Sequence, residues 1–511
     1  MKKTFLSCLF FFCMILTYQS CTSSDEKNEV CISTVTPTLL SMEFRASANP
    51  NILVNDIHGE IIGDSVVECW VRYIMDSKVL IPHFSFNGDE VTIGDQILKS
   101  DSTSYDFKSP VLLTVTAGKQ KKNYKVYVHA FTGIPVLWIE TENRKDIISK
   151  DEYIKAHFKL VEDVRTRGPG DVKEFDGKIK GRGNSTWTMP KKPYAIKLDS
   201  AESFFDEPKD KSWVLLANYT DKTSIRNAIA FYMGRISNLD YTPRYHFVDV
   251  MLNGRYNGTY QLTEKIKIAD YRVNVGKNGF IMEIDGRAPE EADSKYFYVS
   301  HIPQPVNIKD PDVEYDNEDF QYAKNFVETA DATLFSENFK DSENGWQKYF
   351  DVESFVDWYL INEISKNVDA IFWSSCYFHL QRGGKLKMGP IWDFDISFGN
   401  VDYAEARYYD DFWVTNTSWY YRLFQDPFFV NRVKERFDFF YNKQPELMEE
   451  INQNAQYLQY SVVENNEKWN TFYNYNWPNY DIWGNYQNEV QSMKLWLQKR
   501  FEWLKQQFDA M

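Results

Sequence analysis

The periodicity of the chain changes near residue 135, and this change restricts the possible folds more than any other feature. Between about residues 38 and 134, short alternating apolar and polar runs are separated by Asn, Gly, Asp and Ser, as in "VLLTVTAG" (111–118). Many short strands with turn residues between them predict a small all-β sandwich. From residue 135 onward, helical and strand patterns are mixed, which predicts a second, α+β domain over 135–511.

The N-terminal segment has the features of a secretion signal. Two lysines precede an apolar run over 5–16, which is too short to span a bilayer as a helix. Cys21 follows, and the polar stretch "TSSDEKNE" comes after it. The arrangement resembles a bacterial lipoprotein signal over 1–21 that is lipidated at Cys21, with a tether over 22–37. A plain secretory signal cut nearby is the alternative. The lipoprotein interpretation predicts attachment to the outer membrane or cell surface.

The overall charge restricts the class of partner. The 511 residues carry a formal net charge of −15, which argues against a nucleic-acid-binding protein because such proteins need an excess of Lys and Arg. An anionic substrate would require a locally basic pocket.

A glycine-punctuated segment, "GKIKGRGNSTWTMPKKPYAIKLD" (177–199), opens the set of candidate site residues. Glycine allows backbone N–H groups to approach an anion closely, so Arg182 and Asn184 in the turn are candidate ligand-binding residues. Lys197 lies between apolar neighbours in "YAIKL", and we expect its ammonium group to occupy a defined position. An ordinary turn and a surface lysine are the alternatives.

Further elements follow in a recognisable order. "SWVLLAN" (212–218) predicts a buried strand, and Thr220-Asp221 is expected to cap a helix that ends near 235. Residues 246–266 predict a hairpin that turns at Asn253-Gly254. A largely apolar helix is predicted over 351–367 with Asp351 as its cap.

Two carboxylates lie close together near the end of the series. A hairpin is predicted from "CYFHL" to "KLKMGPIW", and "GPIWDFDISFGN" (389–400) overlaps its end and places Asp393 and Asp395 one residue apart. Strand alternation would point both to one face. Like charges at such a distance repel unless a cation lies between them, and carboxylate oxygens suit Mg²⁺. The alternative is a structural loop.

This order of parts is that of a protein kinase: a glycine turn, a strand lysine, a helix, a hairpin, a buried helix that leads to one Asp, and a hairpin that leads to another. In that arrangement the Asp after the long helix accepts the proton of the substrate hydroxyl. The Asp after the hairpin holds magnesium on the phosphates, and the strand lysine neutralises them, so we expect Asp393 and Asp395 to share Mg²⁺.

Four motifs resemble a known family. "RGNSTW…KKPYAIKLD", "LLANYTDKTSIRNAIA", "NGTYQLTEKIKI" and "GPIWDFDISFGN" are similar to the spore coat protein H (CotH) kinase family, and the likeness extends over roughly 135–510. The resemblance implies an atypical protein-kinase-like fold and transfer of phosphate from ATP to Ser or Thr of a protein acceptor. It also implies that Asp369 is the catalytic aspartate, that Asp393 and Asp395 bind Mg²⁺ or Mn²⁺, and that Lys197 contacts phosphate. The first domain, over 38–134, resembles the immunoglobulin-like modules of bacterial surface lipoproteins.

Two positions depart from the typical kinase pattern. Ser374 stands five residues after Asp369, where a typical kinase has an Asn metal ligand. A hydroxyl is a weaker ligand, so Ser374 is a candidate for a weaker metal contact. The helix before residue 235 contains no Glu to pair with Lys197. We consider Glu264, and also Glu283 and Asp285, as substitutes.

Three functions follow from these observations. The first is a phosphotransferase that acts on a protein or glycan acceptor at the cell envelope. The second is a catalytically weak or inactive kinase-like surface protein that binds glycans or partner proteins. The lipoprotein signal, the first domain as a spacer, Ser374 in place of Asn and the many aromatic residues, as in 466–487, motivate it. The third is a glycoside hydrolase, which the acidic pair alone supports.

Overall fold

The computed structural model describes residues 35–53, 56–71, 78–162 and 172–511. The predicted signal peptide, the lipidation residue Cys21 and most of the predicted tether lie outside the described residues. Among the helices of the described part, none combines the length and the apolar character that a membrane span requires.

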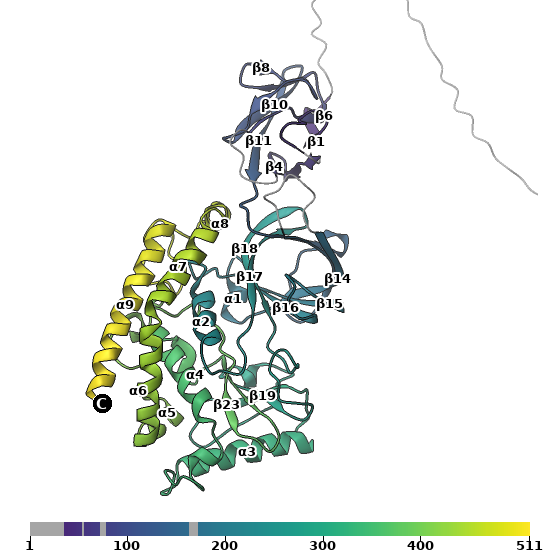
Figure 1. The fold of residues 1–511 in the computed structure, drawn as a ribbon. Coiled ribbons are helices and arrows are strands. Elements are labelled where there is room, and N and C mark those ends of the chain that lie inside the picture. Colours follow the sequence, from purple (N-terminus) through teal and green to yellow (C-terminus); the bar gives the residue numbers. More distant parts are fainter. Residues whose placement is uncertain (1–34, 54–55, 72–77, 163–171) are drawn as a thin grey trace, which may run out of the picture.

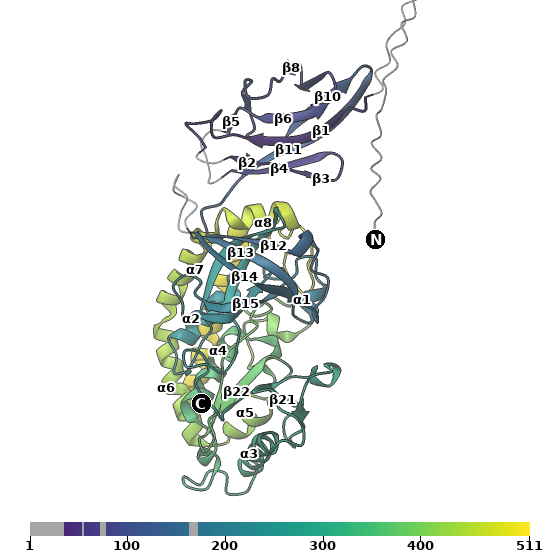
Figure 2. The ribbon, with the colours of Figure 1, turned by 90° about the vertical axis from the view of Figure 1, so that its right-hand side faces the viewer.

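The first part of the described chain is all β, as the alternating pattern predicts (Figures 1 and 2). One sheet has the order β2-β1-β6, a second has the order β3-β4-β11-β10-β7-β8, and β5 pairs with β9. Phe44, Val67, Leu113 and Val126 belong to one buried core of this region. The strands are β1 (Thr38–Phe44), β2 (Ile57–His58), β3 (Glu60–Ile62), β4 (Val66–Val71), β5 (Val79–Leu80), β6 (His83–Asn87), β7 (Glu90–Ile93), β8 (Gln96–Ile97), β9 (Tyr105–Asp106), β10 (Val111–Ala117) and β11 (Gln120–Ala130). Their immunoglobulin-like character stays a prediction.

The next seven strands form a closed barrel in the order β12-β13-β14-β15-β16-β18-β17. They are β12 (Val136–Thr141), β13 (Ile154–Val161), β14 (Val172–Gly181), β15 (Tyr194–Glu202), β16 (Asp210–Leu216), β17 (Tyr245–Leu252) and β18 (Arg255–Glu264). The predicted hairpin is the β17–β18 pair. Its turn residues Asn253 and Gly254 have φ values of 51° and 84°, which is the conformation that this dipeptide favours.

A second sheet and a layer of helices complete the chain. The sheet has the order β20-β21-β19-β22-β23, and the predicted hairpin that precedes Asp393 is β22–β23. Its strands are β19 (Phe280–Ile284), β20 (Tyr296–Phe297), β21 (Val306–Asp310), β22 (Cys376–Leu380) and β23 (Leu386–Met388). The helices are α1 (Ser185–Thr188), α2 (Arg226–Arg235), α3 (Glu318–Leu334), α4 (Val352–Ser365), α5 (Ser418–Leu423), α6 (Pro427–Asn442), α7 (Gln444–Leu458), α8 (Ser461–Trp469) and α9 (Tyr486–Ala510). The described chain is therefore of mixed α+β type.

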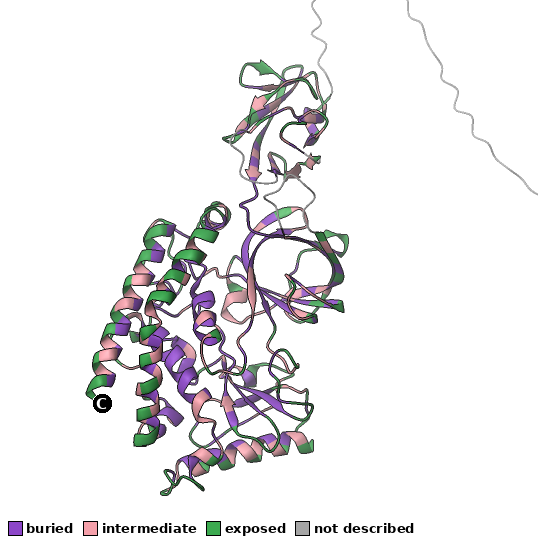
Figure 3. Cartoon of the chain, viewed as in Figure 1, coloured by how far each residue is buried: buried purple, intermediate pink, exposed green. Residues whose placement is uncertain are grey.

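The helix α4 is the central element of this layer. It is buried from Ser354 to Ser365, and Figure 3 shows it covered by the outer helices. Its N-terminus is as predicted, since the carboxylate of Asp351 accepts a hydrogen bond of 2.9 Å from the backbone N–H of Ser354. A helix buried on all sides is apolar all round, which explains the weak periodicity of its sequence.

The helix α2 begins later than the sequence suggests. Asp221 accepts hydrogen bonds from the backbone N–H groups of Thr223 (3.0 Å) and Arg226 (2.8 Å), and the helix starts at Arg226. Asp221 therefore stabilises a non-helical turn before the helix. Its carboxylate accepts hydrogen bonds from backbone N–H groups that have no partner within the helix.

A buried ion pair attaches the last helix to α4. The guanidinium of Arg500 on α9 lies 2.6 Å from the carboxylate of Glu363 on α4, and both side chains are 0% exposed. Glu363 also accepts hydrogen bonds from the backbone N–H groups of Trp413 (2.6 Å) and Val414 (2.7 Å). Every lone pair of this carboxylate is directed at a donor, as a buried charge requires.

Replacing Arg500 with Met should destabilise the fold by about 3–5 kcal/mol, because Glu363 would remain as an uncompensated buried charge. Urea unfolding of the full chain measures this loss. The control is Lys505→Met on the same helix, since Lys505 pairs with Asp509 in an exposed position and the urea midpoint should not move. Equal urea midpoints for the two variants would contradict the stabilising role of the Arg500–Glu363 ion pair.

Candidate active site

A cavity of about 240 Å³ lies where the barrel meets the second sheet. It is lined by the glycine turn before α1, the end of β16, strands β19 and β21, the 3₁₀ turn Val368–Ala370 and the segment 392–395. The charged residues among its lining are Arg182, Lys191, Glu283, Asp285, Arg287, Glu291, Lys309, Asp369, Asp393 and Asp395. Segments separated by more than 200 residues in sequence therefore contribute charge to one enclosed space.

Three aspartates from the sequence analysis meet in this cavity. Burial, followed by the charge of Asp393, raises the pKa of Asp369 to about 7. The same two causes raise the pKa of Asp395 to about 8. The hydroxyl of Thr220 donates a hydrogen bond of 2.7 Å to Asp395, which fixes the orientation of that carboxylate. The negative charge of one carboxylate therefore makes ionisation of the others less favourable.

The acidic pair does not lie on a strand, contrary to the alternation argument. Residues 391–395 form no regular element, and Asp393 has a left-handed φ of 66°. Both aspartates nevertheless line the cavity. The loop is held by α2, because the backbone N–H of Phe394 donates a hydrogen bond of 2.8 Å to Asn227. A tertiary contact, and not strand geometry, directs the two carboxylates inward.

Cationic side chains lie opposite the acids. Burial lowers the pKa of the Arg182 guanidinium, and the nearby groups Tyr377, Asp393 and Glu283 raise it. The guanidinium lies 5.5 Å from the centre of the Trp392 ring. The ammonium of Lys309 lies 3.2 Å from Glu283. The cavity therefore presents positive charge beside a group of carboxylates, which suits an anion bound together with a cation.

Lys191 is a third cation of the cavity lining, and its side chain is buried. Burial lowers its pKa to about 7. Its ammonium donates a hydrogen bond of 2.8 Å to Asn465 on α8 and another to the carbonyl of Thr259 on the barrel. Lys191 thus joins the glycine-rich segment to the helical layer at the cavity wall.

The structure places Lys197 and Glu264 outside the lining of this cavity. Lys197 is exposed on β15 and is not among the cavity-lining residues, because Ile196 and Leu198 take the inward positions and alternation turns Lys197 outward. Glu264 also lies outside the cavity lining. It forms ion pairs with Arg244 (2.6 Å) and Arg272 (3.4 Å) instead.

The remaining predicted residues line the cavity, namely Arg182, Asn184, Asp369, Ser374, Asp393 and Asp395. Ser374 donates a hydrogen bond of 3.2 Å to Asp285. Of the suggested partners for a lysine, Glu283 pairs with Lys309 and not with Lys197. The sequence analysis missed Lys309 and Arg287. A charged residue within the apolar strand "VNIKD" is the signal that could have identified Lys309.

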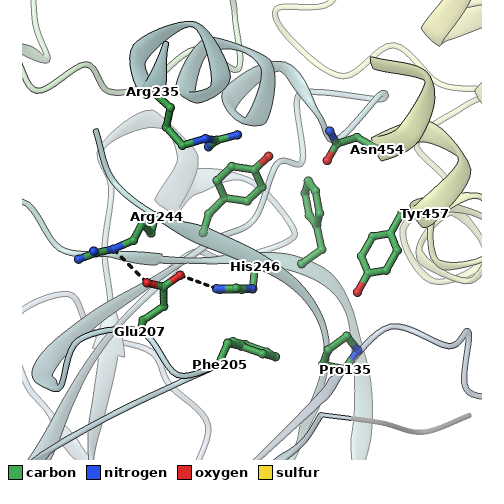
Figure 4. Close-up of a pocket in the computed structure, with 10 residues that line it drawn as sticks. Pro135, Phe205, Glu207, Arg235, Arg244, His246, Asn454 and Tyr457 are labelled. Atoms are coloured by element: carbon green, nitrogen blue, oxygen red, sulfur yellow. Dashed lines mark hydrogen bonds and ion pairs between the residues drawn. The ribbon is translucent and has the colours of Figure 1, made fainter. Parts of the chain in front are cut away.

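A second cavity, of about 400 Å³, lies between the barrel and α7 (Figure 4). Its charges are already paired within the protein: Glu207 contacts Arg244 at 3.1 Å and His246 at 3.0 Å, and Arg235 lies 3.7 Å from Glu450. The first cavity, with its excess of mutually repelling carboxylates, is the stronger candidate for chemistry.

The fold and the cavity together define a mixed α+β protein with a site that combines acidic and cationic side chains. The family model described as CotH kinase protein matches residues 179–504, and the chain belongs to that family. No curated protein matches. A solved structure provisionally described as a glycoside hydrolase from Bacteroides thetaiotaomicron VPI-5482 is similar, with 15% identity over 58% of this chain and 82% of that chain and a TM-score of 0.15.

Replacing Asp395 with Asn should remove charge repulsion without changing the side-chain shape. In EDTA we therefore expect Asp395→Asn to unfold at the same temperature as the parent or a higher one. Mn²⁺ should raise the Tm of the parent but not of the variant, since a ligand stabilises only a state that binds it. Differential scanning calorimetry provides both comparisons.

The matched control is Asp199→Asn, an exposed carboxylate on β15, which should retain the full Mn²⁺-induced shift. An Asp395→Asn protein that responds to Mn²⁺ like its parent would remove this carboxylate from the candidate cation site.

Proposed function

We propose that the chain is a phosphotransferase that moves the terminal phosphate of ATP, bound with Mg²⁺ or Mn²⁺, to a Ser or Thr hydroxyl of a protein acceptor. The observation that carries the proposal is the meeting of Asp369, Asp393 and Asp395 with Arg182 and Lys309 in one cavity. Membership of the CotH kinase family implies ATP use and supports an atypical kinase-like fold.

The carboxylates fit the divalent cation that this reaction needs. Asp393 raises the pKa of both Asp369 and Asp395, so their negative charges repel one another and a cation bound between them would relieve this repulsion. Asp393 and Asp395 are the residues that would hold the ion, with oxygen donors of the type that Mg²⁺ and Mn²⁺ prefer. Such an ion neutralises charge on the phosphate oxygens. Ser374 is at most a weaker contact, because its hydroxyl is bonded to Asp285.

The other side chains have separate tasks. Asp369 accepts the proton of the attacking hydroxyl, and a cation on Asp393 would lower its pKa from about 7 and so favour the ionised base at neutral pH. Arg182 and Lys309 bind phosphate oxygens, and Glu283 orients Lys309 through their ion pair. Phosphoryl transfer depends on such positioning and charge stabilisation more than on covalent chemistry.

The lipoprotein-like signal supports a place at the cell envelope. Lipidation at Cys21 would anchor the chain to the outer membrane or cell surface, with residues 22–37 as the tether and the immunoglobulin-like region as the spacer. The acceptor is then a protein or glycan of the envelope.

A surface of exposed aromatic side chains favours a second candidate function, the binding of glycans or partner proteins through the same scaffold. Tyr403 and Trp477 stack with ring centres 5.8 Å apart. The stretch 466–487 contains four further exposed aromatic residues: Tyr473, Tyr475, Tyr480 and Trp483. Exposed aromatic faces suit sugar rings and protein surfaces alike. A glycan array probed with Asp369→Asn protein would measure glycan binding without phosphate transfer.

Three variants distinguish the proposed site from its surroundings: Asp369→Asn, Lys309→Met and Lys197→Met. With labelled ATP and Mn²⁺, Asp369→Asn should lower phosphate transfer by about 10²–10⁴-fold, because the general base is lost. Lys309→Met should also lower transfer, since a cation on the phosphates is removed. Lys197→Met is the control and should transfer at the parental rate, because Lys197 faces solvent.

Two results would contradict the proposal. One is equal transfer by the parent and Asp369→Asn. The other is a parent protein that transfers no label, even to itself, and shows no rise in Tm with Mn²⁺ and ATP.

A further inference from the structure

A cluster of potential metal ligands in the described chain lies outside the cavity lining, where the N-terminal sheets meet α8. His129 on β11, and Glu464 and Glu467 on α8, each offer a ligand atom, and these atoms all lie within 4.8 Å of one another. Glu464 and Glu467 are three residues apart and so share one face of the helix. The histidine and the two glutamates are separated by more than 330 residues in sequence.

The separation of His129 and Glu464 is that of two ligands of one ion. Their Nδ1 and Oε2 atoms are 3.5 Å apart, which is longer than a good N–H···O hydrogen bond. Two ligands at zinc bond lengths in a tetrahedral site lie about 3.4 Å apart. One imidazole nitrogen and two carboxylate oxygens form a donor set that zinc accepts.

The imidazole of His129 is held in place before any ligand binds. It stacks on the ring of Trp70, with ring centres 4.6 Å apart and an angle of 18° between the planes. Trp70 is its partner in the parallel pairing of β4 and β11, and the Tyr127 ring lies 5.8 Å away in a parallel orientation. A fixed ring orientation lowers the entropic cost of binding a metal.

The local charge also favours a divalent cation. The ammonium of Lys78 donates a hydrogen bond of 2.7 Å to the carbonyl of Val128, so Lys78 contributes one positive charge near the two carboxylates. With a neutral imidazole, the group retains one net negative charge.

We propose that His129, Glu464 and Glu467 form a zinc site that joins the N-terminal sheets to α8. Glu464 is followed by Asn465, whose side chain accepts the hydrogen bond from Lys191 at the cavity wall. On the same helix, the Ser461 hydroxyl lies 2.5 Å from that of Thr132, in the connection between β11 and β12. Zinc would therefore fix the helix that supports Lys191 to the domain that precedes the barrel.

The test uses the full chain with Asp393→Asn and Asp395→Asn, so that zinc cannot bind those carboxylates in the cavity. Isothermal titration calorimetry with ZnCl₂ should show one zinc ion per chain, and zinc should raise the Tm. Adding His129→Phe, which keeps a ring against Trp70, should weaken binding by at least about tenfold. Adding Glu467→Gln, at an exposed position, should have the same effect while leaving the zinc-free Tm unchanged.

The matched control is His157→Phe. His157 also lies near two carboxylates, but its Nδ1 contacts Asp176 and its Nε2 contacts Glu174, so the two acids face different ring nitrogens. This variant should bind zinc as the parent does. Absence of zinc binding in the starting protein, or an affinity that neither His129→Phe nor Glu467→Gln changes, would overturn the proposal.

Discussion

Repulsion between carboxylates in one buried cavity is the constraint on which the rest of the structure depends. Asp369 and Asp395 both hold their protons more tightly because the protein buries them and Asp393 lies near. A protein keeps such an arrangement only if the surrounding structure fixes it, because each group would otherwise move apart or turn toward solvent. The fold meets this requirement from two sides, through α2 and through α4.

The two helices hold the acidic loop by its backbone. Arg226 on α2 donates a hydrogen bond of 3.1 Å to the carbonyl of Ser397, and the backbone N–H of Phe398 donates one of 2.7 Å to Ser365 at the end of α4. The same end of α4 leads directly into the turn that carries Asp369. Since α9 is tied to α4 by Arg500, the C-terminal helix contributes to the position of the cavity without lining it.

Local sequence was sufficient for elements whose shape is set by neighbouring residues. The Asn253-Gly254 turn and the Asp351 cap follow from the chemistry of those side chains, and the structure has both. Alternation within "YAIKL" could also have shown that Lys197 faces away from Ile196 and Leu198. The prediction that Lys197 contacts phosphate came instead from the order of motifs in kinases.

Other features depend on contacts that sequence spacing does not reveal. Lys309 reaches Glu283 because β21 pairs with β19, a register that only the folded sheet defines. The inward direction of Asp393 depends on a left-handed φ and on Asn227, which lies 166 residues earlier. The order of motifs was therefore enough to suggest which aspartates meet, and it was not enough to identify the cations that accompany them.

The most direct test of the account is a crystal structure of the full chain with Mn²⁺ and a non-hydrolysable ATP analogue, with the manganese located by its anomalous scattering. The account predicts a manganese peak in contact with Asp393 and Asp395, and a triphosphate that reaches Arg182 and Lys309. Manganese or nucleotide bound outside this cavity, with those aspartates free of metal, would contradict it.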